Sequence, residues 1–180
     1  MKKITVLLLI LLLPTSVLAQ ASFKLGPRGG YYKSLDADDG KMFFGGAARL
    51  MLAPAIGVEA SIDYRQEEYR NGVATVKSWP VMVTGLIYPL PVVYGLIGAG
   101  WYNSKVSYDI QVLEITIEEE TTQDFGWHFG LGADIPLSYS VSLVGDVRYV
   151  YLNYDFEHLP GSEKIDVDFY AITVGLLFEL

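Results

Sequence analysis

The chain has 180 residues, of which 51% are hydrophobic and only 19% charged, and its formal net charge is −8. Nucleic-acid partners need clustered lysine and arginine, so this balance argues against them. The sequence contains no cysteine, which excludes disulfides, thiolate metal sites and a cysteine nucleophile.

The N-terminal residues have the three parts of a secretory signal peptide. Met1–Lys3 is a short cationic start, and 4–13 is a largely apolar run. Small or medium-sized residues, Val17 and Ala19, stand at the −3 and −1 positions before Gln20. A run of roughly ten apolar residues covers only about half of a bilayer core, so a membrane anchor fits less well. We therefore expect a cleaved signal peptide over 1–19, with Ala21 as the other candidate cleavage position, and one domain over 20–180.

Eight later segments are typical of β-strands, because apolar side chains alternate along them with small or polar ones. The alternation is clear at 124–135, where Phe129 and Leu131 share one face and His128 and Gly130 share the other. No later segment has the 18 consecutive apolar residues of a membrane helix. The predicted strands are 23–32, 42–52, 56–65, 79–88, 93–102, 124–135, 140–151 and 170–180.

The connections between these strands alternate in length. Three are short turns that each contain proline, at 53–55, 89–91 and 136–139. Four are longer and more polar, at 34–40, 66–74, 103–123 and 155–164. Short turns at one end and long loops at the other are typical of an up-and-down barrel whose ends face different compartments.

The two faces of the strands favour a membrane barrel over a soluble barrel of the lipocalin kind. The apolar face is large and aromatic, whereas the other face is rich in glycine and serine and is too small for a solvated exterior. Tyrosine and tryptophan gather near strand ends, as at a membrane interface. The sequence therefore predicts an all-β fold, an eight-stranded antiparallel up-and-down transmembrane β-barrel with a polar, plugged lumen.

The stretches 94–101, 129–137 and 143–149 share a pattern of glycines and aromatic residues. In this pattern the chain resembles the small outer-membrane β-barrel family of the OmpA/OmpX type. The final strand resembles the C-terminal signal read by the barrel-assembly machinery, although that signal usually ends in phenylalanine and this chain ends in Phe178-Glu179-Leu180. The resemblance implies a monomer in the outer membrane of a Gram-negative-type bacterium, in contact with outer-membrane lipid and lipopolysaccharide.

The charged residues on the small, polar face would point into the lumen. Basic and acidic residues are balanced there, which predicts an internally neutralised ion-pair network, since unpaired charge in a narrow lumen is costly. The alternative for the same residues is a proton or ion path. The residues are Lys24, Arg28, Arg49, Arg65, Arg148, Glu59, Asp63, Asp134, Asp146 and Glu179.

We expect no catalytic, cofactor-binding or metal-binding residues. His128 faces inward and His158 lies in the last long loop, whereas the lipid A deacylases and palmitoyltransferases of this barrel size need a His/Ser pair on the lipid-facing side. The acidic run 36–40 lacks the spacing of a calcium loop and has Ala47 where the twelfth-position glutamate belongs. The chain is therefore predicted not to be an enzyme.

The long connection 103–123 is predicted to form a hairpin that projects beyond the membrane. Alternation continues from Val106 to Val112 and again at Ile115 and Ile117, before an acidic run. An exposed strand edge can pair with a partner protein, although charges there also serve to block aggregation. The predicted role is structural or surface-interacting. A narrow small-solute channel is the alternative, and a lipid-modifying enzyme comes last.

Overall fold

The computed structural model describes residues 22–35, 40–69, 74–108, 120–154, 165–166 and 168–180. The predicted signal peptide, His158 and most of the acidic run 36–40 lie outside these residues. Within the described ranges, no helix is long and apolar enough to cross a membrane.

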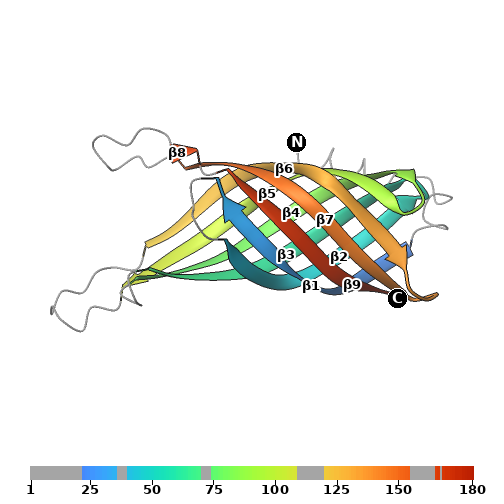
Figure 1. The fold of residues 1–180 in the computed structure, drawn as a ribbon, viewed down its shortest axis with the longest axis horizontal. Helices are drawn as coiled ribbons and strands as arrows, with labels where there is room; N and C mark the ends of the chain where they lie inside the picture. The colour runs from blue at the N-terminus through green and yellow to red at the C-terminus, as the bar shows by residue number, and fades with distance from the viewer. Residues whose placement is uncertain (1–21, 36–39, 70–73, 109–119, 155–164, 167) are drawn as a thin grey trace, which may run out of the picture.

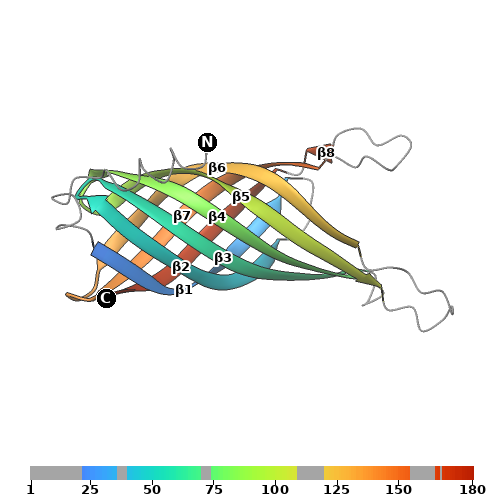
Figure 2. The ribbon, with the colours of Figure 1, turned by 180° about the vertical axis from the view of Figure 1, so that it is seen from behind.

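Eight long strands close into an antiparallel barrel (Figures 1 and 2), which confirms the predicted all-β, eight-stranded barrel. The ring runs β6-β5-β4-β3-β2-β1-β9-β7, and pairing of β6 with β7 closes it. The short β8 pairs only with the end of β7. The strands are β1 Ser22–Ser34, β2 Lys41–Ala53, β3 Ile56–Tyr69, β4 Ala74–Leu90, β5 Val93–Tyr108, β6 Glu120–Pro136, β7 Val141–Tyr154, β8 Ile165–Asp166 and β9 Phe169–Glu179.

Several strands are longer than the sequence predicts, and the difference lies at the long-loop end. The three short turns lie within one or two residues of the predicted positions, at 54–55, 91–92 and 137–140. In contrast, β4 begins at Ala74, five residues before its predicted start, and β6 begins at Glu120, four residues before its predicted start. Backbone pairing continues there after the apolar alternation has faded, because ladder hydrogen bonds do not require an apolar face.

The outer face of the barrel is apolar, as predicted. Phe129 and Leu131 are 48% and 69% exposed, while the intervening residues face the interior and His128 is 1% exposed. Large apolar side chains cover this surface on every side of the barrel, far beyond the patches that a soluble monomer presents. Such a surface requires lipid around it.

Aromatic rings gather on the outer face toward the long-loop end. Phe125 packs edge-on against both Trp101 and Trp127, with ring centroids 5.8 and 5.3 Å apart. A second group is centred on Tyr149, whose ring lies 4.7 Å from Tyr151 and 4.8 Å from Tyr170. This aromatic girdle is the arrangement expected at a membrane interface.

Closure of the ring leads to a simple prediction about electrophoresis. Every barrel strand has two partners, so the folded protein should resist SDS unless it is boiled. Unboiled protein in detergent should therefore migrate differently from the boiled form. Identical migration of both forms, with recovery of the mature protein as soluble periplasmic material, would contradict the membrane-barrel fold.

Candidate functional site

The centre of the lumen is organised around the carboxylate of Glu59, on β3. One oxygen accepts hydrogen bonds from Arg28 Nη1 at 3.2 Å and from Arg148 Nη2 at 3.0 Å. The other accepts from Arg49, with the Nε at 3.0 Å. Glu59 and its three arginine partners are all at least nine-tenths buried. A single carboxylate therefore bridges guanidinium groups from β1, β2 and β7 across the barrel.

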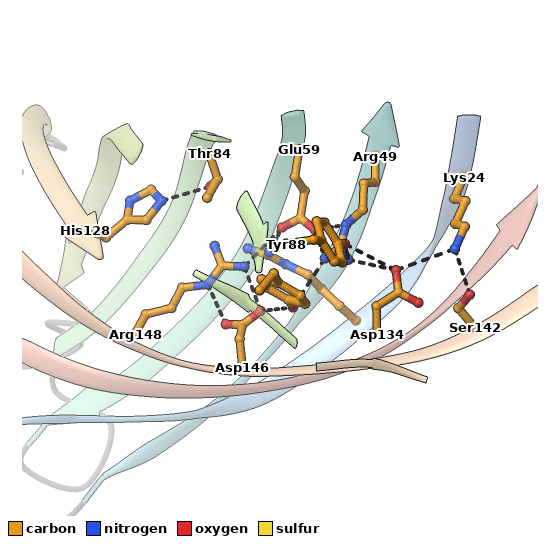
Figure 3. A network of polar contacts seen from close by, with 12 residues as sticks. Lys24, Arg49, Glu59, Thr84, Tyr88, His128, Asp134, Ser142, Asp146 and Arg148 are labelled. Atoms are coloured by element: carbon orange, nitrogen blue, oxygen red, sulfur yellow. Dashed lines mark hydrogen bonds and ion pairs between the residues drawn. The ribbon is translucent and has the colours of Figure 1, made fainter. Parts of the chain in front are cut away.

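Three further acids complete this ion-pair network. Asp63 takes a bidentate contact from Arg28, at 2.8 and 2.7 Å, and Asp146 takes one from Arg148. Asp134 accepts from Arg49 at 3.2 Å and lies 3.5 Å from the amine of Lys24. The network joins four basic and four acidic side chains, so these eight of the ten predicted lumenal charges neutralise one another. Figure 3 labels six of the eight, Lys24, Arg49, Arg148, Glu59, Asp134 and Asp146. Fully paired charges are the condition for burying so many of them.

Two tyrosines that the sequence analysis did not single out support the network. Tyr88 and Tyr94 both accept hydrogen bonds from Arg49. Tyr88 donates in turn to Asp134 and Tyr94 to Asp146, at 3.3 and 3.2 Å. The predicted strands that contain them, 79–88 and 93–102, are nearly apolar on both faces, so alternation did not show which face is polar. The observed register places both tyrosines on the inward face.

His128 lies on the same interior face, beyond Arg148 in Figure 3. Its Nε2 is 2.8 Å from the hydroxyl of Thr84, two strands away. The intervening register position is Gly98, where a Cβ would meet both the His128 ring and the β4 backbone. Glycine is therefore needed for this close approach. The prediction that His128 faces inward is confirmed.

Arg65 was predicted to join the ion pairs, but the structure places it among aromatic rings at the long-loop end. Its guanidinium carbon lies 4.3 Å from the ring centroid of Tyr32 and 4.8 Å from that of Phe169. Phe43 and Tyr102 approach within 5.5 and 5.8 Å. These four rings come from four different strands, so only barrel closure brings them around one cation. Glu179 also lies outside the network, exposed at the turn end, where it accepts a hydrogen bond from Ser22.

Removing the positive charge of Arg65 should weaken this end of the barrel. We expect Arg65→Met, which keeps most of the side-chain length, to lower the free energy of unfolding in lipid vesicles by about 1–2 kcal/mol through lost cation–π contacts. Arg65→Lys should lose less. Lys41→Met is the control, since Lys41 is an exposed basic residue at the same end. Equal stability of Arg65→Met and the wild type would show that the rings do not hold the cation.

A projecting sheet continues past the barrel at the long-loop end, formed by 66–69, 74–77, 105–108 and 120–125 (Figure 1). On one side, β3 stops pairing with β2 at Tyr64↔Phe44 but continues to pair with β4 as far as Tyr69↔Ala74. Within the described residues, the β3 backbone beyond Tyr64 therefore has an edge without a partner strand.

The other side of the projecting sheet has a longer edge of the same kind. Here β6 pairs with β5 from Glu120↔Val106, whereas its pairing with β7 begins only at Gly126↔Leu152. The end of β7, 153–154, pairs with β8 in a register that continues the β7–β9 ladder, on the side of β7 that faces away from β6. In the part of the chain that the structure describes, no strand pairs with the β7 side of β6 over 120–125. The predicted hairpin is confirmed at its base, and its tip lies outside the described residues.

The described residues contain no cluster of three or more histidine, cysteine or acidic side chains that could hold a metal ion. A hollow of about 160 Å³ lies at the turn end of the lumen, lined in part by Lys24, Tyr88 and Asp134. Beneath it, Lys24 donates to Ser142 at 2.8 Å, so the ion-pair network begins at the floor of this hollow.

A closed antiparallel barrel with an apolar outer face and a charged interior defines a membrane-spanning β-barrel. The family model for the outer membrane protein beta-barrel domain matches residues 5–178. The chain belongs to this family and is an outer-membrane protein.

Solved structures of outer-membrane proteins share the fold at low sequence identity. A major outer membrane protein of Thermus thermophilus is 18% identical, with a TM-score of 0.64, over 89% of this chain and 100% of that one. Ail of Yersinia pestis is 21% identical, with a TM-score of 0.52, over 89% and 97%. OprG of Pseudomonas aeruginosa is 16% identical, with a TM-score of 0.55, over 89% and 96%. No curated protein matches the chain.

Proposed function

We propose that this outer-membrane barrel acts as a monomeric, non-enzymatic surface-interaction protein through its long-loop end. The observation that supports this role best is the projecting sheet, with its two edges that no described strand covers. Such edges are costly to leave open, and proteins usually blunt or cover them. An edge kept outside the barrel is suited to strand addition by a partner.

The residues along both edges favour a positively charged, extended partner segment. Glu67 and Glu68 lie in the β3 edge, and Glu120 lies at the start of the β6 edge, preceded by two more glutamates in the sequence. Main-chain hydrogen bonds would provide affinity, and the carboxylates would select basic side chains. Ail, which shares the fold, is described as an attachment invasion locus protein and is solved with a heparin analogue, an anionic ligand. The acidic edges here favour the opposite charge.

The interior supports a role other than catalysis or transport. His128 points into the lumen and contacts Thr84, so it does not meet the lipid-facing requirement of an acyl-transfer site. The buried ion-pair network occupies the lumen of a barrel just wide enough to be filled by side chains. Both features favour a role at the surface of the barrel over a role in its lumen.

Peptide binding to the full chain in phosphatidylcholine nanodiscs tests the proposal. The probe is a twelve-residue peptide of alternating lysine and valine, and hydrogen exchange of backbone amides is the readout. We expect slower exchange over 120–125. A peptide of equal charge with proline at alternate positions should bind weakly, because it cannot pair with a strand edge.

Two variants of the protein separate edge binding from general attraction to an acidic chain. Glu120→Lys should reduce binding several-fold. Glu179→Lys, the same charge reversal at the turn end, should leave it unchanged. Equal binding of the proline peptide, or equal effects of both variants, would contradict the proposal and leave these charges the simpler role of blocking aggregation.

A further inference from the structure

The hollow at the turn end of the lumen has polar groups that the ion-pair network leaves free. Its volume is about 160 Å³, and Lys24, Tyr88 and Asp134 are its polar lining residues. Arg49, which contacts both Tyr88 and Asp134, is fully buried behind them, so the hollow has a closed floor. The short turns of an outer-membrane barrel face the periplasm. The hollow is therefore a small pocket on the periplasmic side.

The carboxylate of Asp134 has one oxygen in use and one oxygen free. Lys24, Arg49 and Tyr88 all contact Oδ2, at 3.5, 3.2 and 3.3 Å. Figure 3 shows the dashed lines meeting at one oxygen and none at the other. Within the described residues Oδ1 has no hydrogen-bond partner, and it is not sealed from solvent. Because Asp134 as a whole is only 7% exposed, Oδ1 is an unpaired acceptor on a largely buried residue.

The ammonium group of Lys24 is the least enclosed cation of the network. Its side chain is 16% exposed, against 3% or less for each of the three arginines. Its 3.5 Å contact with Asp134 is the longest ion pair of the described network, and its hydrogen bond to the Ser142 hydroxyl measures 2.8 Å. An ammonium group has three N–H donors, so one remains for a ligand.

The remaining walls of the hollow are apolar. They are formed by Met51 and by three prolines, Pro54, Pro91 and Pro136, which come from the three short connections. Proline has no N–H group, so these residues add apolar surface without adding a donor. An aliphatic chain can pack against such a wall while a polar end group reaches Lys24 and Asp134.

One free acceptor and one free donor of opposite charge define the ligand. A simple anion would be repelled by Asp134, and a simple cation would be repelled by Lys24. An ammonium and a carboxylate on one carbon satisfy both, because the ammonium can donate to Asp134 Oδ1 and the carboxylate can accept from Lys24 Nζ. The hollow has about half the volume of the smallest drug-sized pockets, which suits a small molecule or an end group.

We propose that this hollow binds the α-amino-acid zwitterion of a periplasmic ligand, with an aliphatic side chain against the prolines. The zwitterion belongs either to a free amino acid or to an amino acid that is attached through its side chain to a longer molecule. The site lies at the opposite end of the barrel from the projecting sheet, and it does not depend on the proposed surface role.

Chemical-shift titration of the isotope-labelled full chain, folded in detergent micelles, tests this with L-leucine as the probe. We expect saturable shifts of the amides of Met51 and Asp134, and none at Phe44 near the long-loop end. N-acetyl-L-leucine lacks the ammonium, and L-leucinamide lacks the carboxylate. Each should bind about tenfold more weakly or worse, as expected for the loss of one hydrogen bond between charged groups.

Lys24→Met removes the donor but leaves Asp134 paired with Arg49 and Tyr88, so the variant should keep its heat-modifiability. It should bind L-leucine about tenfold more weakly or worse. Its binding of L-leucinamide should equal that of the wild type, because this ligand has no carboxylate for Lys24. Lys41→Met, at the long-loop end, is the control and should bind L-leucine as the wild type does. The ligand series on the wild type tests the site even if Lys24→Met does not fold.

Nε-acetyl-L-lysine distinguishes the two sources, since it has the same zwitterion on a longer side chain. Binding equal to that of L-leucine assigns the site to an amino acid attached to a longer molecule, and clearly weaker binding assigns it to a free amino acid. Equal binding of L-leucine and its two blocked forms, an equal loss in Lys41→Met, or shifts confined to other parts of the barrel would overturn the site.

Discussion

Glu59→Gln is expected to lower the free energy of unfolding in lipid vesicles by about 3–5 kcal/mol, the largest loss for any single conservative change in this barrel. Glutamine keeps the size of the side chain but removes the charge that three buried arginines share, Arg28, Arg49 and Arg148. Those guanidinium groups would then be buried with a net positive charge. Urea-induced unfolding followed by tryptophan fluorescence measures the effect.

The matched control is Glu179→Gln, the same change at an exposed position. Glu179 accepts one hydrogen bond from Ser22 at 2.8 Å, and exposed contacts of this kind contribute about 1 kcal/mol or less. If both variants lose the same small amount, Glu59 is not the centre of a buried network.

Leu131→Arg is expected to cost about 2–4 kcal/mol, because Leu131 lies on the lipid-facing side of β6 and is 69% exposed there. The control is Leu137→Arg. Leu137 is exposed to a similar extent, 58%, but lies in the turn after β6, where an arginine reaches the interface at a cost of about 1 kcal/mol or less. Folding titrations in vesicles compare the two variants. No loss for Leu131→Arg would mean that this face does not meet lipid.

The strand faces could be predicted from the sequence because side chains alternate between the two faces of a strand. Once one residue is assigned to the lumen, the orientation of every other residue of that strand follows. For this reason Arg49, Glu59 and Arg148 were correctly assigned to the interior. Their individual partners could not be predicted. Glu59 meets Arg148 across the lumen, and that contact depends on how the ring closes and how its strands are staggered.

Arg65 shows most clearly what could not be predicted from the sequence. Its inward orientation follows from alternation, but its surroundings do not, since Tyr32, Phe43, Tyr102 and Phe169 come from four strands that are distant in sequence. The projection of β5 and β6 was expected as a hairpin, but the extension of β3 over 66–69 and of β4 over 74–77 was missed, for a different reason. Alternation of apolar residues marks the part of a strand that faces lipid. A strand can continue beyond the lipid without this alternation.

Planar-bilayer recording of the purified wild type tests most directly whether the lumen of this barrel is closed, as a role at its surface requires. The paired charges around Glu59 should exclude a continuous water column, so little steady conductance is expected. Arg148→Ala should lose stability before it gains conductance, because it leaves the buried Asp146 carboxylate without its ion-pair partner. Large and stable single-channel currents from the wild type would contradict a closed lumen and favour a channel.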